Sequence, residues 1–264
     1  MRITHIESKP FRRLRFINAG KRGKRESAAL PISMGRVDEL PDGLDALVVA
    51  SDLQGVCPLG NGETELLGVA LANELVALSE EGLLPYPERT GVVLAGDLYA
   101  APAGNVRGAT GDVREVWERF ADSHRWVLGV QGNHDTYGTQ RDEAHLSSRE
   151  GIHLLDAELA SVDSIQWGGV GRIIGDPKKI GRRSEADFLA ALDLVLEDTP
   201  DVLVLHQGPR GGSGQRGCDL VRARVDQAKP PLVIAGHVHW ASPLAELPSG
   251  TQLLNVDGRV VIFR

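Results

Sequence analysis

Residues 125–135 read RWVLGVQGNHD, an apolar run that turns polar over its last residues. The apolar part predicts a buried β-strand, and the polar end predicts a turn. Four further segments follow the same plan: ALVVASD (46–52), GVVLAGD (91–97), DVLVLH (201–206) and PLVIAGHVH (231–239). Segments with apolar residues at helical spacing alternate with them, at 63–82, 111–124, 184–197 and 217–228. This alternation predicts an α/β fold with a largely parallel sheet.

The expected strand ends carry side chains that bind metals. In an open α/β sheet, ligands bind beyond the carboxyl ends of the strands. The five expected ends carry two aspartates, one asparagine and four of the eight histidines, namely Asp52, Asp97, Asn133, His134, His206, His237 and His239. Each residue alone has an ordinary explanation as a turn residue or a structural histidine. Their common position at one edge of the sheet predicts a metal site.

The donor set indicates the class of metal centre. Imidazole nitrogens and carboxylate oxygens without thiolates suit Mn²⁺, Fe or Zn²⁺. The donors are too many for one tetrahedral zinc ion, whereas two ions that share a carboxylate would use them. Paired ions about 3.5–4 Å apart are the usual device for in-line displacement at phosphorus, and they lower the pKa of a shared water.

Five motifs, taken in chain order, resemble those of a known family. They are D-x-Q (Asp52, Gln54), G-D (Gly96, Asp97), G-N-H-D (Gly132 to Asp135), the single His206, and G-H-x-H (Gly236 to His239). The series is similar to that of the calcineurin-like metallophosphoesterase superfamily, and it begins near residue 46. The resemblance implies a four-layer α/β/β/α sandwich with a dinuclear site at the sheet edge. It also leads us to expect residues 243–263 in the second sheet.

The resemblance implies roles for individual residues. The implied ligands of one ion are Asp52, Gln54, Asp97 and His239. Those of the second ion are Asp97, Asn133, His206 and His237, so that Asp97 bridges the two ions. His134 is expected to act in catalysis, as a general acid or as an electrostatic stabiliser near the leaving group. Asp135 is expected either to hold the His134 imidazole or to cap the following helix or turn.

Two positions depart from the commonest pattern of the family. Gln54 stands where His is most frequent. An amide oxygen is a harder and weaker ligand than imidazole, so Mn²⁺ is the favoured ion, with Fe, Zn²⁺ and Mg²⁺ as alternatives. Gln at this place also occurs in the family's manganese-dependent ADP-ribose/CDP-alcohol diphosphatase branch. Ala100 stands where many members carry an acid that supports the ligands.

The composition excludes several classes of protein. The 264 residues are 42% hydrophobic and 25% charged, which is typical of a globular protein. Two cysteines, Cys57 and Cys218, cannot form a disulfide framework or a Cys-based zinc site. We find no apolar run of the roughly 18 residues that cross a bilayer and no signal-peptide core at the N-terminus. We therefore expect a cytoplasmic protein without membrane contact, of open oligomeric state. We expect one domain over 1–264, in which 1–45 form a strand-rich extension with a basic loop.

The charge is distributed unevenly along the chain. Residues 1–26 hold nine Lys/Arg and two acids, a net charge of +7, whereas the remaining 20 basic and 34 acidic residues give −14. Strand patterns at 2–7, 11–17 and 29–37 place residues 18–26 in a basic loop. A basic arm can contact nucleic acid. An acidic body repels polyanions, which favours a solvated loop.

These observations predict a metal-dependent enzyme. We expect hydrolysis of a small phosphate ester or diphosphate, with nucleotides among the candidates, by in-line attack of a hydroxide activated by two metals. The alternatives are a catalytically silent binding or scaffold protein on this fold, or a nuclease that uses the basic N-terminal loop. A scaffold has no need for His134, which is not an expected ligand, and this favours the enzyme. Weaker candidates for substrate contact are Tyr99, Trp240, Arg107, Arg172, Arg182, Arg183, Arg210 and Arg216.

Overall fold

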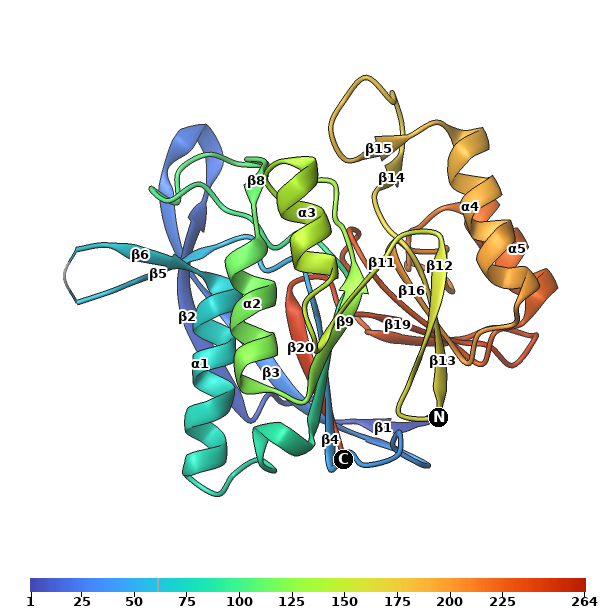
Figure 1. The fold of residues 1–264 in the computed structure, drawn as a ribbon, viewed down its shortest axis with the longest axis horizontal. Coiled ribbons are helices and arrows are strands. Elements are labelled where there is room, and N and C mark those ends of the chain that lie inside the picture. Colours follow the sequence, from blue (N-terminus) through green and yellow to red (C-terminus); the bar gives the residue numbers. More distant parts are fainter. Residues whose placement is uncertain (61) are drawn as a thin grey trace.

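Two β-sheets packed face to face form the centre of the protein, and helices cover the outer faces (Figure 1). The computed structural model describes residues 1–60 and 62–264. In sheet order, the first sheet contains β11 (Ile152–Leu155), β9 (Trp126–Val130), β7 (Thr90–Leu94), β4 (Ala46–Ser51), β20 (Arg259–Phe263), β3 (Arg25–Val37), β2 (Arg12–Ala19), β5 (Val56–Pro58) and β6 (Thr64–Leu66), with β1 (Ile3–Ile6) on β3. The second sheet contains β12 (Glu158–Val162), β13 (Ile165–Val170), β16 (Val202–Gln207), β17 (Leu232–Gly236), β19 (Gln252–Asn255) and β18 (Leu244–Glu246).

The helices divide between the two sheets. The first sheet is covered by α1 (Leu67–Glu80), α2 (Arg114–Ser123) and α3 (Gln140–Ser147), and the second by α4 (Glu185–Glu197) and α5 (Asp219–Ala228). Two short strand pairs lie outside these two sheets. They are β8 (Gly111–Asp112) with β10 (Asp135–Thr136), and β14 (Ile173–Ile174) with β15 (Arg182–Arg183). Within residues 1–60 and 62–264, no helix has the length and apolar character that a membrane crossing requires.

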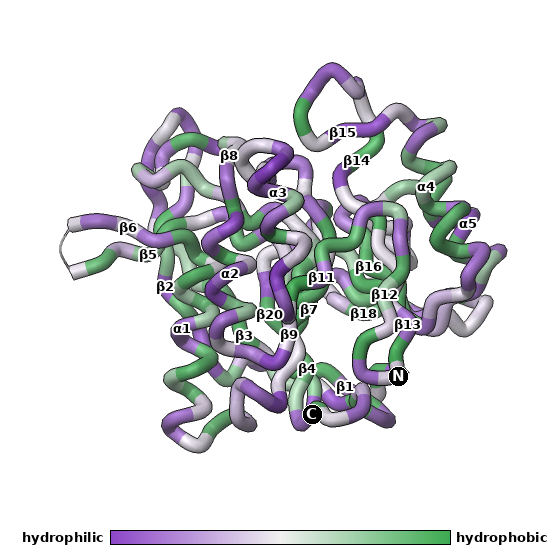
Figure 2. The backbone as a smooth tube through the Cα atoms, viewed as in Figure 1, coloured by the Kyte–Doolittle hydropathy of each residue, from purple (hydrophilic) through white to green (hydrophobic). Residues whose placement is uncertain are grey.

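Three apolar clusters lie between these layers. The cluster between the first sheet and its helices contains Trp117 and Phe120. Between the sheets, the rings of Trp126 and Trp167 meet edge to face at 5.8 Å. The third cluster lies under α4 and α5 and contains Phe188. Apolar residues are concentrated in the strands and the inner helix faces (Figure 2). The predicted α/β/β/α sandwich is therefore confirmed.

The strand directions explain where the site forms. In the first sheet β11, β9, β7 and β4 are parallel, and in the second sheet β13, β16, β17 and β19 are parallel. β4, β7, β9 and β17 are buried along their whole length, as their apolar sequences predict. Because parallel strands end at the same edge, the polar residues after them meet there.

The last strand corrects one expectation. β18 and β19 lie in the second sheet as expected, but β20 lies in the first, antiparallel to β4 and parallel to β3. Its side chains alternate between two cores, because Val260 and Ile262 face the helices while Val261 and Phe263 face the second sheet. A strand that is apolar on both faces fits the interior of either sheet, so its pattern does not identify which one.

Two helices also differ from expectation. α1 begins at Leu67, since the preceding residues form β6 and pair with β5. α3 is an additional helix that the sequence pattern did not indicate. It begins with a capping box between Thr139 and Asp142, and Leu146 is its one buried residue. A helix with so narrow an apolar face gives little periodic signal.

The N-terminal strands extend the first sheet. β2 and β3 form an antiparallel hairpin whose register runs from Arg12–Ile32 to Ala19–Arg25. At its tip, the backbone N–H of Gly20 donates to the Lys24 carbonyl over 2.7 Å. β3 pairs with β20 and β2 pairs with β5. The basic loop expected from the sequence is therefore the tip of a hairpin in the same sheet as β4, β7 and β9.

Candidate metal centre

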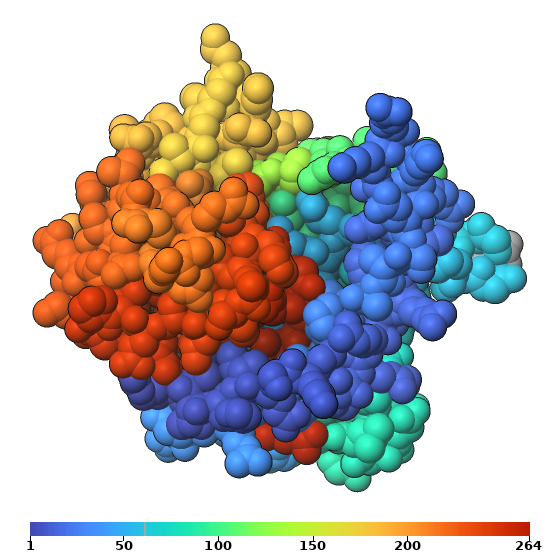
Figure 3. Space-filling view, turned by 180° about the vertical axis from the view of Figure 1, so that it is seen from behind, coloured from blue at the N-terminus to red at the C-terminus, as the bar shows by residue number. Residues whose placement is uncertain are grey.

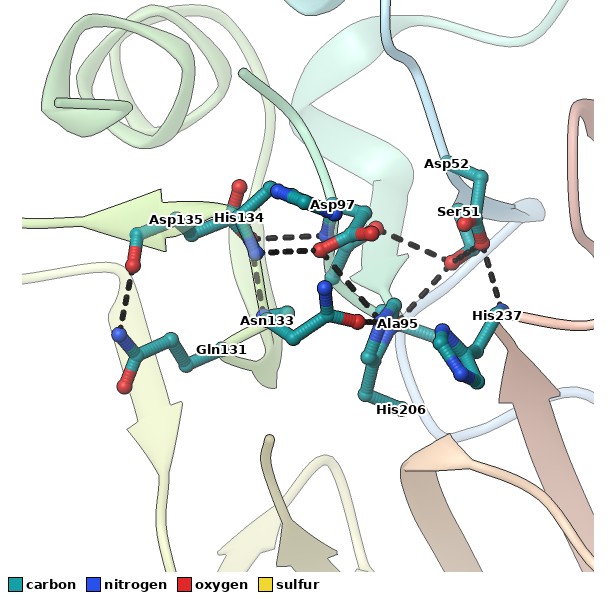
Figure 4. A network of polar contacts seen from close by, with 12 residues as sticks. Ser51, Asp52, Ala95, Asp97, Gln131, Asn133, His134, Asp135, His206 and His237 are labelled. Atoms are coloured by element: carbon teal, nitrogen blue, oxygen red, sulfur yellow. Dashed lines mark hydrogen bonds and ion pairs between the residues drawn. The ribbon is translucent and has the colours of Figure 1, made fainter. Parts of the chain in front are cut away.

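The strand ends bring most of the predicted ligands together (Figure 4). Asp52, Asp97 and Asn133 follow β4, β7 and β9, whereas His206 and His237 come from β16 and the end of β17. The ligand atoms of Asp97, His206 and His237 all lie within 4.8 Å of one another. This separation suits side chains that share one cation.

The backbone at these positions is strained. Asp52, Asp97 and His237 have φ angles of 55°, 57° and 66°, in the left-handed region. Residues other than glycine seldom adopt this conformation, and where they do it is often at functional sites. In each case the turn redirects the side chain at the end of a buried strand. Three such turns at one sheet edge set this edge apart as a candidate functional site.

Asp97 lies at the centre of the contacts. Its Oδ1 accepts a hydrogen bond from the backbone N–H of His134 at 2.8 Å and lies 3.4 Å from His206 Nε2. Its Oδ2 accepts from the Gln54 amide nitrogen at 3.2 Å. Burial raises the pKa of Asp97, but the nearby His206 outweighs burial, and the net pKa is lowered. The carboxylate is thus kept ionised and available to a cation.

His206 is oriented by the backbone. Its Nδ1 donates to the Ala95 carbonyl at 2.8 Å, so Nε2 faces Asp97 and lies 3.1 Å from Asn133 Oδ1. A ring nitrogen held in this way fixes the tautomer that presents Nε2 to a metal. Burial lowers the pKa of His206, but the Asp97 and Asp52 carboxylates outweigh it and raise the pKa to about 10. The same negative field attracts a metal cation.

Asp52 and His237 are joined to each other. Asp52 Oδ2 accepts from the Ser51 hydroxyl at 2.6 Å and from the His237 backbone N–H at 2.9 Å. Burial raises the pKa of Asp52 well above its usual range. The His237 ring lies 5.1 Å from that of His206. Burial of the His237 side chain is the main cause that lowers its pKa to about 4, and the nearby charge of His206 is the second. The His237 imidazole is therefore neutral, the form in which it binds metals.

Gln54 contacts the cluster, whereas His239 lies outside it. Gln54 contacts Asp97 through its amide nitrogen rather than its oxygen. The His239 side chain is 66% exposed, and its Nδ1 lies 3.0 Å from Asp257 Oδ2. His239 is thus outside the cluster of Asp97, His206 and His237. His239 therefore lies at the sheet edge that the sequence predicts, but it is not among the donors that meet there.

Asp135 has a different role from the ones expected. Its carboxylate is fully buried and accepts the backbone N–H groups of Asp97, Leu98 and Gly132 at 2.7–2.9 Å. It neither orients the His134 ring nor caps α3, whose N-cap is Thr139. Both expectations are wrong, because the carboxylate points inward and ties together the two turns that carry Asp97 and Asn133. Burial and the Asp97 charge raise its pKa to about 6.

Comparison with known proteins identifies the family of the chain. The family model for calcineurin-like phosphoesterases matches residues 47–241, a range that includes every predicted ligand. The chain belongs to the calcineurin-like phosphoesterase family. The match begins within β4, so the β2–β3 hairpin precedes the matched region. A comparison with curated proteins finds no significant match in sequence.

Comparison with solved structures finds one with a TM-score above 0.5 to this calcineurin-like phosphoesterase, and others with lower scores. TT1561 of Thermus thermophilus superposes with a TM-score of 0.56 and 15% identity, over 80% of this chain and 88% of that chain. An archaeal phosphodiesterase gives a TM-score of 0.37 at 13% identity, over 80% and 82% of the two chains. Vps29 complexed with Zn²⁺ from Entamoeba histolytica gives 0.36 at 14% identity, over 80% and 72%. At such identities, the first superposition shows a shared fold and nothing more.

His134 of the phosphoesterase lies beside the loop of residues 101–110. Its Nδ1 is 3.3 Å from Thr110 Oγ1, and a Cβ added to Gly108 would lie 3.3 Å from its Cε1. β8 and β10 join this loop to the His134 turn, with Gly111 N–H donating to the His134 carbonyl at 3.1 Å. Sequence reasoning missed Thr110, which stands in a loop without any motif.

Two other supporting residues were also missed. Ser51 is buried and its hydroxyl donates to Asp52, and Asp257, 18 residues after His239, contacts the His239 ring. The position of Ser51 at the end of an apolar run was the available sequence signal. No local signal marks Asp257, because it reaches the site only through the position of β20.

The weaker candidates separate into two groups. Tyr99 and Arg107 line a cavity next to the site. Trp240 is buried, and its Nε1 donates to the Arg216 carbonyl at 2.6 Å, so its ring is part of the core. The remaining arginines include several in ion pairs, Arg172 and Arg183 with Asp156 and Arg210 with Asp219.

A cavity lies next to the candidate metal centre. It has a volume of about 430 Å³, and on the side of the candidate metal centre it is lined by Asp52, Gln54 and Asp257. Its other walls come from the β2–β3 hairpin and the loop of residues 101–109. A cavity of this size suits a small-molecule ligand.

Proposed function

We propose that this calcineurin-like phosphoesterase hydrolyses phosphate esters or diphosphates at a centre of two divalent cations, with Mn²⁺ as the favoured ion. The observation that carries the proposal is the cluster of Asp97, His206 and His237, whose ligand atoms lie within 4.8 Å of one another. Because the Nδ1–H of His206 donates a hydrogen bond to the Ala95 carbonyl, Nε2 is the ring nitrogen at which a cation would replace the proton.

The donor set fits two cations better than one. Asn133 Oδ1 lies beside His206 and extends the cluster on one side, and Asp52 extends it on the other. We assign Asp97 as the residue shared by the two ions. Carboxylate, amide and imidazole donors without thiolate favour Mn²⁺ among the first-row metals available to such a site.

Gln54 and His239 complete the proposed ligand set. As a ligand, Gln54 would present its amide oxygen, which is one rotation of the amide away from its present contact with Asp97. The Asp257 carboxylate holds Nδ1 of His239, which leaves Nε2 as the ligand atom. Such a carboxylate–histidine pair is the usual support of a metal-binding imidazole.

The chain's own residues have separate tasks in the proposed reaction. When bound, divalent cations supply a nucleophile from water at neutral pH and neutralise phosphate charge. Asp135 fixes the turns that present Asp97 and Asn133. His134, beside Thr110 at the edge of the centre, gives a proton to the leaving oxygen.

The experiment compares His134→Ala with the wild type on phosphodiesters and phosphomonoesters in Mn²⁺. We expect the variant to keep its metals and to lose turnover by about 10²–10⁴-fold. The loss should be smaller for p-nitrophenolate, a stable leaving anion, than for an alkyl alcohol, which needs the proton. His145→Ala, at an exposed position on α3, is the matched control and should match the wild type.

Three outcomes would contradict parts of the proposal. A wild-type protein that binds two metals and hydrolyses none of the esters would be a binding or scaffold protein. Loss of metal from His134→Ala would make the residue a ligand rather than a catalytic group. An equal loss for both leaving groups would mean that His134 stabilises phosphoryl charge without donating a proton.

A further inference from the structure

The β2–β3 hairpin forms a wall of the cavity beside the metal centre. Phe16, Asn18 and Lys21 from the hairpin line the cavity, and Asp52 and Gln54 line it from the metal side. Figure 3 shows the hairpin, in dark blue, standing at one side of a recess whose other side is the red C-terminal part of the chain. Because the family match begins at residue 47, this wall lies outside the matched region.

The loop of residues 101–110 lies between this wall and His134. At one end, a Cβ added to Gly104 would lie 3.0 Å from Ile17 Cγ2, and one on Gly23 would lie 3.5 Å from the Asn105 carbonyl. At the other end, the loop contacts His134 through Thr110. Figure 1 shows the hairpin tip beside this loop, next to β8. Arg107 therefore stands between the hairpin and His134.

Two cationic side chains that line the cavity are not engaged in ion pairs with the part of the chain that the structure describes. Lys21 and Arg107 both line it, and among the described residues neither has an ion pair with a carboxylate. The acids in the cavity besides Asp52 are Glu26 and Asp257. Glu26 lies against the backbone of Gly20 at the hairpin tip, and Asp257 is held by His239.

We propose that Lys21 and Arg107 form a subsite for a second phosphate group of the substrate, apart from the one that reacts at the metal centre. The inference rests on the proposed function and specifies its substrate class, a compact molecule with two phosphates. Guanidinium and ammonium groups bind phosphate through charge-assisted hydrogen bonds. A cavity of about 430 Å³ holds a molecule of nucleotide size.

A long nucleic acid is the less favoured ligand of these cations. The chain beyond residue 26 carries a net charge of −14, which repels an extended polyanion. Lys24 and Arg25, also at the hairpin tip, are exposed and do not line the cavity. A small bisphosphate would use Lys21 but not Lys24, whereas a nucleic acid strand passing over the tip would use both.

The experiment uses two chromogenic esters that differ by one phosphate. They are thymidine 5′-(p-nitrophenyl phosphate) and the same compound with a 3′-phosphate. We expect the wild type, in Mn²⁺, to favour the 3′-phosphorylated ester by about 10-fold in kcat/KM, the value of one good charge-assisted contact. Lys21→Gln and Arg107→Gln should each reduce this preference toward one, and Lys24→Gln should retain it. The absence of a preference in the wild type, or its equal loss in Lys24→Gln, would overturn the proposal.

A binding measurement separates this proposal from the proposed function. Calorimetry would compare thymidine 3′,5′-bisphosphate with thymidine 5′-monophosphate on the Mn²⁺-loaded protein. We expect tighter binding of the bisphosphate, lost in Lys21→Gln and kept in Lys24→Gln, even if neither ester is hydrolysed. Equal binding of the two nucleotides, or tight binding of a decathymidylate that Lys24→Gln weakens as much as Lys21→Gln, would contradict the subsite.

Discussion

The backbone N–H of His134 donates a hydrogen bond to Asp97 Oδ1 over 2.8 Å. The carboxylate at the centre of the cluster thus also holds the turn that presents the proposed catalytic histidine. Movement of Asp97 would displace both the metal site and His134. The positions of the two residues are therefore coupled, and changes in the turns around them should affect metal binding and turnover together.

Asp135→Asn tests the role of the buried carboxylate. Its two oxygens accept three backbone N–H groups, and an amide would place an NH₂ group against at least one of these donors. A buried unsatisfied donor costs about 1–3 kcal/mol. We expect urea denaturation to show a free energy of unfolding lower by about 2–4 kcal/mol. Asp198→Asn, at an exposed helix end, should leave it unchanged. A fully stable Asp135→Asn protein would show that the carboxylate is not a structural brace.

Gly132→Ala tests the packing of the two turns. A Cβ at Gly132 would collide with the backbone nitrogen and the carboxylate of Asp97, both of which are buried. Since Asp97 must move to make room, we expect Mn²⁺ affinity, measured by calorimetry, to fall by about 10–100-fold. A Cβ at Gly60 meets nothing within 4 Å, which makes Gly60→Ala the matched control. Unchanged affinity in Gly132→Ala would mean that the turns can separate without harm to the site.

The pH dependence of the free energy of unfolding should show the lowered pKa of His124, a residue remote from the metal centre. Burial lowers its pKa from 6.5 to about 4, with a smaller effect of Arg119. As the pH falls from 6.5 to 4, the unfolded chain binds a proton that the folded chain does not, so stability is lost over this window. We expect His124 to account for about 2–3 kcal/mol of that loss.

The measurement is urea denaturation at pH 7 and pH 4.5 with chelator present, so that metal release does not contribute. His124→Leu should lose less stability between the two pH values than the wild type does. His145→Leu, at an exposed position, should lose as much as the wild type. Equal losses in all three proteins would show that His124 is protonated in the folded state.

The fold, and the sheet edge at which the candidate ligands lie, could be predicted from the sequence because both depend on local sequence patterns. Buried strands such as β4 and β9 are apolar runs, and Asp52 and Asn133 mark the points where those runs stop. The sheet of β20 could not be read, because RVVIF is apolar on both faces and its partners β3 and β4 lie far away in the chain. Strand partners at such separation leave no local trace.

The inner supports of the site were less predictable than its ligands. Asp135 stands in the motif, but its bonds to backbone groups of Asp97 and Leu98 depend on how two turns meet. Thr110 and Asp257 approach His134 and His239 from separate segments. Sequence spacing identifies residues that share an edge, whereas contacts between loops depend on the folded arrangement.

Anomalous diffraction from crystals grown with Mn²⁺ tests the central claim, that these strand ends build a two-metal centre shared by Asp97. We predict two manganese peaks about 3.5–4 Å apart, on either side of the Asp97 carboxylate, with His206 and His237 on one of them. Asp97→Ala should lose both peaks, since each ion loses its common ligand. A single peak under saturating Mn²⁺, or two peaks that persist in Asp97→Ala, would contradict the account.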